Sequence, residues 1–266
     1  MNYWTQSNDN IYVAAHRGWC ARYPENTMEA FRAAIELGVD QIETDVRMTA
    51  DGQLVLVHDA TVDRTTNGSG SVCDMTLAQL RQLDAGIKKG EQFAGCLIPT
   101  MEELMELVRD HPTMTLDIEL KDYPHLLGEK RAFEACDKAL EMIARYGFED
   151  RFVINSFSTE LHRHIREKYG SRYKHHVFYP IEHMTVADEA IYDYAYCACV
   201  FGLKEGKVTP ADALDFSRRT GVRVWAGASA KDEATVTQAI EAGCQLITCN
   251  NPDEVLGILR AMGKHK

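Results

Sequence analysis

The chain alternates short apolar runs with longer segments whose apolar residues recur every three or four positions. Short apolar runs bounded by turn-forming residues predict strands, and the three-to-four spacing predicts helices that bury one face. The predicted strands are 11–15, 41–47, 54–57, 114–120, 152–154, 176–179, 197–201, 222–226 and 245–248. The predicted helices are 26–37, 76–83, 101–109, 129–146, 159–168, 210–219, 233–242 and 253–262, with a short helix before Tyr194.

This alternation predicts a parallel α/β fold. Counting the runs that open at Ile11 and Val39 gives eight strand–helix units, which favours a closed (β/α)8 TIM barrel over a doubly wound open sheet. No glycine-rich nucleotide-binding motif follows a predicted strand. We therefore expect a single TIM-barrel domain over residues 1–266. Residues 60–98, rich in turn-formers, would be a small insertion subdomain after the second strand that covers one mouth of the barrel.

Local signals fix several boundaries. Asn26, with Glu29 three residues on, is interpreted as the N-cap of the first helix, and Gly38 closes that helix. Asp51-Gly52 predicts a two-residue hairpin turn between the second strand and the run 54–57.

The hairpin over residues 40–59 also holds the first candidate chemistry. Glu43 and Asp45 are two apart, so their side chains share one face of the strand, and His58-Asp59 follow the return strand. Two neighbouring carboxylates repel unless they are protonated or bind a cation. The stretch is therefore a candidate metal and acid–base site; a solvated edge strand with ordinary surface acids is the alternative.

Barrel chemistry gathers at the carboxyl ends of the strands. His16-Arg17 end the first strand, and Glu119 and Lys121 end the third barrel strand on one face. Three carboxylates (Glu43, Asp45 and Glu119) without a nearby cysteine suit a hard divalent ion, Mg²⁺ or Ca²⁺, better than zinc.

The remaining groups complete a set suited to phosphodiester cleavage. Histidine side chains ordinarily titrate near neutrality, so His16 and His58 could serve as base and acid. Arg17 offers a planar fork for phosphate oxygens and Lys121 a point charge. Cations and a metal would offset the charge that grows on the phosphoryl oxygens.

Composition narrows the class of partner. The net charge of −11 argues against nucleic acid as the main partner but allows a phosphorylated small molecule. No apolar run approaches the length needed to span a membrane, and the stretch MNYWTQSNDN lacks the layout of a secretory signal. Eight scattered cysteines without paired spacing indicate reduced thiols in a cytosolic protein. Homo-oligomerisation stays open.

Taken together, the motifs resemble those of the glycerophosphodiester phosphodiesterases, in order from the first strand to about Phe157. The resemblance is carried by His16-Arg17-Gly18, Pro24-Glu25-Asn26-Thr27, Glu43-x-Asp45, His58-Asp59, Asp63-Arg64-Thr65-Thr66-Asn67-Gly68-x-Gly70, Pro99-Thr100-x-Glu102-Glu103, Glu119-x-Lys121 and Asn155-Ser156-Phe157.

The resemblance implies a barrel with an insertion after the second strand, and it implies a role for each site residue. Glu43, Asp45 and Glu119 would bind the divalent metal. His16 and His58 would form the acid–base pair, and Arg17 and Lys121 would hold the phosphate. The expected products are sn-glycerol 3-phosphate and an alcohol, which places the enzyme in lipid and glycerol metabolism.

The last third departs from the family pattern at Ala226-Gly227-Ala228 after Trp225 and at Cys249-Asn250-Asn251. Neither place holds a metal or acid–base group, so we expect these loops to affect the choice of alcohol. Phe157 and Trp225 could line the mouth or simply pack the barrel.

Several residues also have structural interpretations. Arg17 could pair with Glu25, itself a weak metal-side candidate, and Asp59 would orient its neighbours. Histidines 111, 125, 162, 164, 175 and 176 are interpreted as solvated or structural, without carboxylate partners at ligand spacing.

Two other functions stay open. One is a phospholipase D-like barrel acting on lysolipids. The other is a non-catalytic binding barrel, against which the retention of all the proposed polar residues argues.

Overall fold

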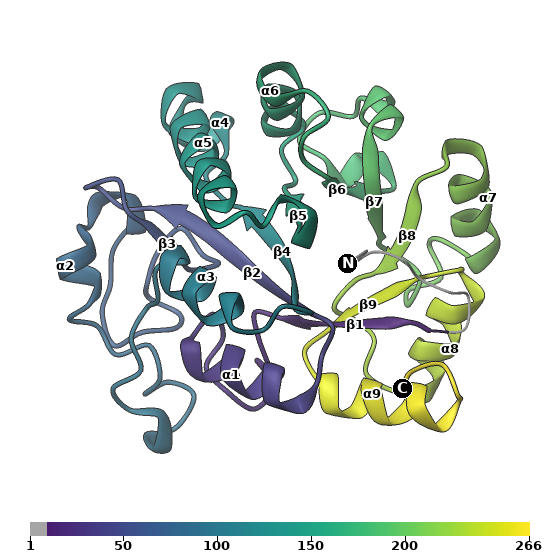
Figure 1. Cartoon of the computed structure of the whole chain (residues 1–266), viewed down its shortest axis with the longest axis horizontal. Coiled ribbons are helices and arrows are strands. Elements are labelled where there is room, and N and C mark those ends of the chain that lie inside the picture. The colour runs from purple at the N-terminus through teal and green to yellow at the C-terminus, as the bar shows by residue number, and fades with distance from the viewer. Residues whose placement is uncertain (1–9) are drawn as a thin grey trace.

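Eight parallel strands form a closed ring in the computed structural model, which describes residues 10–266 (Figure 1). β1 pairs in parallel with both β2 and β9, and this double pairing closes the barrel. The predicted TIM barrel is therefore confirmed. The barrel strands are β1 (Tyr12–His16), β2 (Gln41–Met48), β4 (Thr115–Leu120), β5 (Phe152–Asn155), β6 (His175–Tyr179), β7 (Ala195–Val200), β8 (Arg223–Ala226) and β9 (Leu246–Cys249).

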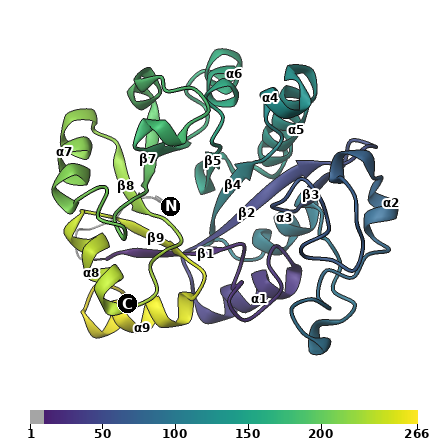
Figure 2. The same cartoon turned by 180° about the vertical axis from the view of Figure 1, so that it is seen from behind.

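Helices surround the ring of strands, as both views show (Figures 1 and 2). The longer helices bury an apolar stripe against the strands, and most helices begin with a side-chain cap, so the three-to-four spacing of the sequence becomes one buried face. The helices are α1 (Met28–Leu37), α2 (Leu77–Leu80), α3 (Met101–Arg109), α4 (Pro124–Leu127), α5 (Glu129–Tyr146), α6 (Thr159–Tyr169), α7 (Pro210–Thr220), α8 (Glu233–Glu241) and α9 (Pro252–Ala261). Short 3₁₀ helices at 181–183 and 189–193 stand where one short helix was expected.

Two local predictions were wrong. The N-cap of α1 is Thr27, whose side chain accepts a hydrogen bond from the backbone of Ala30. Asn26 instead adopts a left-handed backbone with φ 54°, which turns its amide toward β2. The hairpin loop holds three residues, because the pair Thr49–Gln53 closes it and Gly52 takes the positive φ of 76°.

The return strand of the hairpin, β3 (Leu54–Leu56), lies outside the ring and runs antiparallel to β2. Residues 60–98 follow it and contain α2 and the 3₁₀ helices 72–74 and 91–93. Their apolar side chains form a separate cluster with β3 and the residues beside it: Val55, Val57, Val62, Val72, Leu80, Ala85 and Ile98. This segment lies at one side of the barrel, next to β3 (Figure 1).

The barrel interior is apolar in one layer and charged in the next. Trp225 is fully buried in a small cluster with Ala14, Val153, Cys197 and Leu246. Beyond it, β2 and β4 bring acidic side chains into register, with Glu43 opposite Asp117 and Asp45 opposite Glu119. The register of two neighbouring strands thus concentrates carboxylates at one place.

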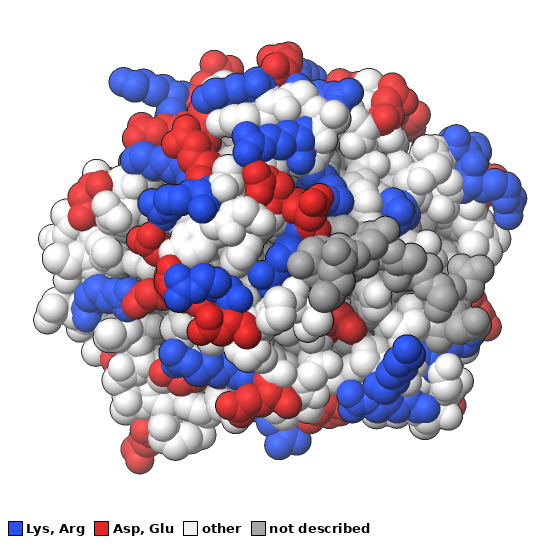
Figure 3. Space-filling model, viewed as in Figure 1, with Lys and Arg blue, Asp and Glu red and all other residues white. Residues whose placement is uncertain are grey.

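No helix within residues 10–266 is long and apolar enough to cross a membrane. All eight cysteines are free thiols. Basic and acidic side chains intermingle on the face shown in Figure 3. The polar stretch at residues 1–9 lies outside the described residues.

One buried arginine joins the start of β5 to the end of α3 and the loop before β4, which predicts an effect on stability. The Arg151 guanidinium donates to the backbone carbonyls of Val108, His111 and Met114. Arg151→Leu would remove these charged hydrogen bonds and leave the Met114 carbonyl without its donor, so we expect a loss of about 3 kcal/mol in the free energy of unfolding, measured by denaturant titration.

The matched control is Arg218→Leu on the exposed face of α7, where the side chain is 75% exposed. It should change the free energy of unfolding by less than about 0.5 kcal/mol. Equal effects of the two changes would contradict the role given to Arg151.

Candidate active site

Three buried carboxylates converge from two neighbouring strands. Glu43 and Asp45 extend from β2 and Glu119 from β4, and one oxygen of each lies within 4.8 Å of the others. Burial, together with the charges of Asp45, Glu119 and Asp117, raises the pKa of Glu43 well above its usual value. The cluster is therefore electrostatically strained as long as no cation offsets its charge.

Protein cations compensate part of that charge. The Lys121 ammonium lies 3.2 Å from Asp45 Oδ1 and forms a short ion pair with Glu119 Oε1. Burial opposes the ionisation of Asp45, but the charges of Lys121 and Arg17 outweigh it and lower the pKa of Asp45. Burial also raises the pKa of Glu119, and Lys121 only partly counters this.

The donor set fits a hard divalent ion. All candidate ligand atoms are carboxylate oxygens, which Mg²⁺ and Ca²⁺ prefer. Glu43 Oε1 is buried and has no hydrogen-bond partner, whereas Glu43 Oε2 accepts from the backbone of Arg17 at 2.9 Å. A buried carboxylate oxygen without a partner is costly, and an ion at this place would remove the cost.

The two predicted acid–base histidines lie beside this cluster. His16 Nε2 is 3.8 Å from Glu43 Oε2, and burial together with the Arg17 charge lowers the pKa of His16 to about 4. On the other side of each ring, Nδ1 is held at 2.6 Å: for His16 by Asn250 Oδ1 and for His58 by Asp59 Oδ1. Both rings are thus fixed through Nδ1.

Asp59 has the orienting position expected from the sequence. It accepts hydrogen bonds from Arg64 as well as from His58, and the Arg64 contacts lower the pKa of Asp59. Asp59 therefore faces His58 as a carboxylate.

Arg17 forms the ion pair with Glu25 that was expected as an alternative to phosphate binding. Its Nη1 lies 3.0 Å from Glu25 Oε1, and its Nε lies 3.3 Å from Asp45 Oδ2. Glu25 also binds Arg64 and is not part of the carboxylate cluster. The Arg17 backbone is left-handed with φ 55°, and Gly18 follows because a Cβ there would lie 2.7 Å from Ala30 Cβ.

A cavity of about 250 Å³ opens over these groups. Its lining includes seven polar residues of the carboxylate side: His16, Arg17, Glu43, His58, Asp117, Glu119 and Lys121. The opposite wall is largely apolar, and there Phe157 stacks on Phe178 with ring centroids 3.7 Å apart. Trp225, in contrast, does not line the cavity and lies in the barrel interior.

Sequence reasoning missed a shell of residues that hold the site in place. Asn26 Nδ2 donates to Asp45 Oδ2 at 2.8 Å, so the residue assigned to helix capping positions a carboxylate of the cluster. Arg47 donates to the backbone carbonyls of His58 and Lys121. The inward position of Arg47 on β2, two residues after Asp45, was the only local signal.

Two of the remaining histidines have carboxylate partners, contrary to the prediction. His176 Nδ1 lies 2.8 Å from Asp117 Oδ2, and both residues line the cavity. His164 pairs with Asp137 at 2.9 Å. These carboxylate partners are far away in the sequence, which is why local spacing did not reveal them.

Comparisons with known proteins fit this geometry. Residues 16–254 match the model of the glycerophosphoryl diester phosphodiesterase family. A glycerophosphodiester phosphodiesterase of Caldanaerobacter subterraneus is 36% identical over 260 residues, covering 94% of this chain and 98% of the relative.

Solved structures show the same fold. The glycerophosphodiester phosphodiesterase of Agrobacterium tumefaciens superposes with a TM-score of 0.75 at 26% identity, covering 92% of this chain and 98% of that one. An Oleispira antarctica phosphodiesterase in complex with the product sn-glycerol-3-phosphate superposes with a TM-score of 0.79 at 24% identity, covering 94% and 96%. The chain therefore belongs to the glycerophosphoryl diester phosphodiesterase family and is an enzyme.

Proposed function

We propose that this enzyme hydrolyses glycerophosphodiesters to sn-glycerol 3-phosphate and an alcohol with the help of a divalent metal ion. The observation that carries the proposal is the buried cluster of Glu43, Asp45 and Glu119, which opens into a cavity between two histidines with fixed rings. The product sn-glycerol-3-phosphate in the complex of the Oleispira antarctica phosphodiesterase supports the same reaction.

Each polar group of the cavity has a proposed task. Glu43, Asp45 and Glu119 would hold Mg²⁺ or Ca²⁺, which supplies positive charge to the phosphoryl oxygens. Lys121 and Arg17 add positive charge beside the cluster, and an arginine fork matches two phosphate oxygens. To bind the phosphate, the Arg17 guanidinium would have to contact the substrate while it stays paired with Glu25 and Asp45.

The histidines would move protons on opposite sides of the phosphorus. One ring removes a proton from the attacking hydroxyl or water, and the other gives a proton to the departing alkoxide. The fixed Nδ1 atoms leave both Nε2 atoms for this task, and His16 Nε2 already faces the carboxylate cluster.

The apolar wall of the cavity also suits a second class of substrate, the lysolipids. Phe157, Phe178 and Phe201 form one aromatic side of the cavity and could contact the apolar part of a lysolipid. Cleavage assays with water-soluble glycerophosphodiesters and with a lysolipid decide between these two substrate classes. The eight free thiols support a cytosolic, reducing location.

Metal removal is the first test of the proposal. We expect EDTA to abolish release of sn-glycerol 3-phosphate from a panel of glycerophosphodiesters, and Mg²⁺ or Ca²⁺ to restore it. Glu119→Gln should weaken metal binding at least about tenfold in a calorimetric titration, because one anionic ligand is lost.

Glu102→Gln serves as the matched control, since Glu102 lies exposed on α3 and pairs with Arg145. It should leave metal affinity unchanged. An unaltered metal titration of Glu119→Gln would remove Glu119 from the ligand set, and full activity in EDTA would reject metal dependence.

The acid–base pair gives the second test. His16→Ala and His58→Ala should each lower kcat by about 100-fold or more with little change in melting temperature, because each removes one proton-transfer group. His111→Ala, outside the cavity lining, is the control and should keep wild-type kcat. Wild-type turnover in either active-site variant would exclude that histidine from the reaction.

A further inference from the structure

The loop after β9 reaches the acid–base machinery. Asn250 Oδ1 lies 2.6 Å from His16 Nδ1, although 234 positions separate the two residues in the sequence. A carbonyl oxygen can only accept a hydrogen bond, so Nδ1 carries the proton of the neutral imidazole. The lone pair of His16 is then on Nε2, the atom that faces Glu43.

Cys20 favours the orientation of the Asn250 amide in which the oxygen faces His16. Cys20 Sγ lies 3.2 Å from the same Asn250 Oδ1. Burial, aided by the charge of Glu25, raises the pKa of Cys20 to about 12, so its sulfur stays a protonated donor. In this orientation the oxygen accepts from both neighbours, whereas a reversed amide would offer its NH₂ group to the thiol sulfur, which is only a weak acceptor.

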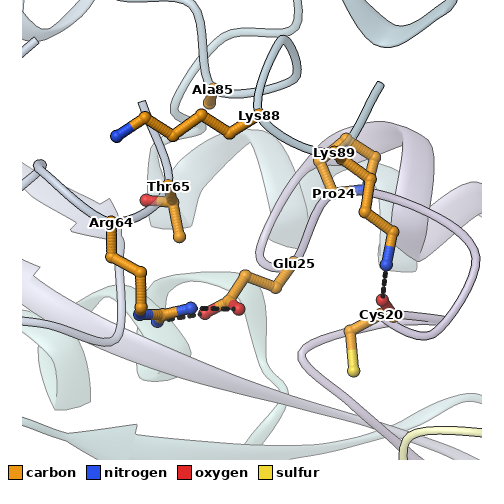
Figure 4. Close-up of a pocket in the computed structure, with 8 residues that line it drawn as sticks. All are labelled: Cys20, Pro24, Glu25, Arg64, Thr65, Ala85, Lys88 and Lys89. Carbon is orange, nitrogen blue, oxygen red and sulfur yellow. Dashed lines mark hydrogen bonds and ion pairs between the residues drawn. The ribbon is translucent and has the colours of Figure 1, made fainter. Parts of the chain in front are cut away.

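The backbone around Cys20 is held from two sides. The Ala21 amide donates to the Asn250 carbonyl at 3.1 Å, which joins the loop after β1 to the loop after β9. Lys89, from the segment 60–98, donates to the carbonyls of Cys20 and Ala21 at 2.7 and 2.8 Å, and Figure 4 shows the contact with Cys20. These backbone hydrogen bonds hold the Cys20 thiol in place next to the Asn250 amide.

The two histidines differ in the charge of their partners. His58 Nδ1 faces the Asp59 carboxylate, whereas His16 Nδ1 faces the neutral amide of Asn250. A carboxylate partner stabilises an imidazolium ring, and an amide fixes the ring without adding charge. His16 is thus held by a neutral partner that leaves the ring neutral, with its Nε2 lone pair free to accept a proton.

We propose that Asn250, oriented by the Cys20 thiol, is a positioning residue that holds His16 in the tautomer with the Nε2 lone pair directed at the reaction centre. The inference rests on the proposed function, because it gives His16 the task of the base. It also revises the expectation that the Cys249-Asn250-Asn251 loop affects only the choice of alcohol.

Kinetics of matched variants test the proposal. Asn250→Leu removes the acceptor but keeps the branched shape of the side chain, and it should lower kcat about 100-fold with KM within about twofold, because orientation is lost but substrate binding is not. Asn250→Asp keeps an acceptor and should retain kcat within about fivefold. Cys20→Ser should resemble the wild type, and Cys20→Ala should lower kcat by about three- to tenfold.

Asn251→Ala is the control for loop structure. Asn251 is the same residue type at the next position, and its side chain makes no capping hydrogen bond to α9. This variant should keep wild-type kcat. A loss equal to that of Asn250→Leu would show that any disturbance of the loop suffices and would overturn the proposal.

A spectroscopic readout tests the tautomer without turnover. In enzyme with ¹⁵N-labelled histidine, two-bond ¹H–¹⁵N spectra distinguish a protonated Nδ1 from a protonated Nε2, and loss of one signal set in His16→Gln identifies His16 among the ten histidines. The wild type and Asn250→Asp should show the Nδ1–H form. Asn250→Leu should show a mixture of the two tautomers.

The outcomes separate this inference from the proposed function. Absence of diester cleavage together with an Nδ1–H form that depends on Asn250 would reject the function and keep the positioning role. Cleavage by the wild type with unchanged kcat in Asn250→Leu, or with a protonated Nε2 on His16, would reject the positioning role alone.

Discussion

The repulsion among Glu43, Asp45 and Glu119 is the constraint around which the site is arranged. Buried carboxylates a few ångströms apart repel each other, which helps to raise the pKa of Glu43, and Lys121 and Arg17 offset part of the charge at Asp45. The barrel tolerates the arrangement because β2 and β4 are hydrogen-bonded neighbours whose register is fixed by the whole ring. In the proposed function, a divalent cation relieves this repulsion.

A rigid polar shell keeps these charges in place. Asn26 donates to Asp45, and Arg47 clamps the backbone at His58 and Lys121. Beyond this shell, Arg64 joins Glu25 to Asp59 and thereby couples the segment 60–98 to the loops after β1 and β3. A cavity whose polar groups are fixed before binding loses little free energy when the substrate arrives.

The sequence was a good guide to the fold because its signals are local. Apolar runs of strand length, helical spacing and Gly38 at a helix end each depend on neighbours within a few residues. Most element boundaries agree to within a residue or two, but α2 ends at Leu80, three residues before the predicted end, and α4 was not predicted. The metal-site candidates were equally accessible, since Glu43 and Asp45 share a strand face and Glu119 ends a neighbouring strand. Errors arose where two local signals competed, as at Asn26 and Thr27, which both suit a cap.

By itself, the amino-acid sequence determined the barrel, the carboxylates and histidines placed at strand ends, and the family. Only the tertiary structure decided which residues these side chains contact, such as Asn250 for His16 and Asp117 for His176. It also decided that Trp225 lies in the barrel interior and not at the mouth. The reason is geometric. Strand and helix periodicity act over a few residues, whereas a hydrogen bond between β1 and the loop after β9 exists only once the ring has closed.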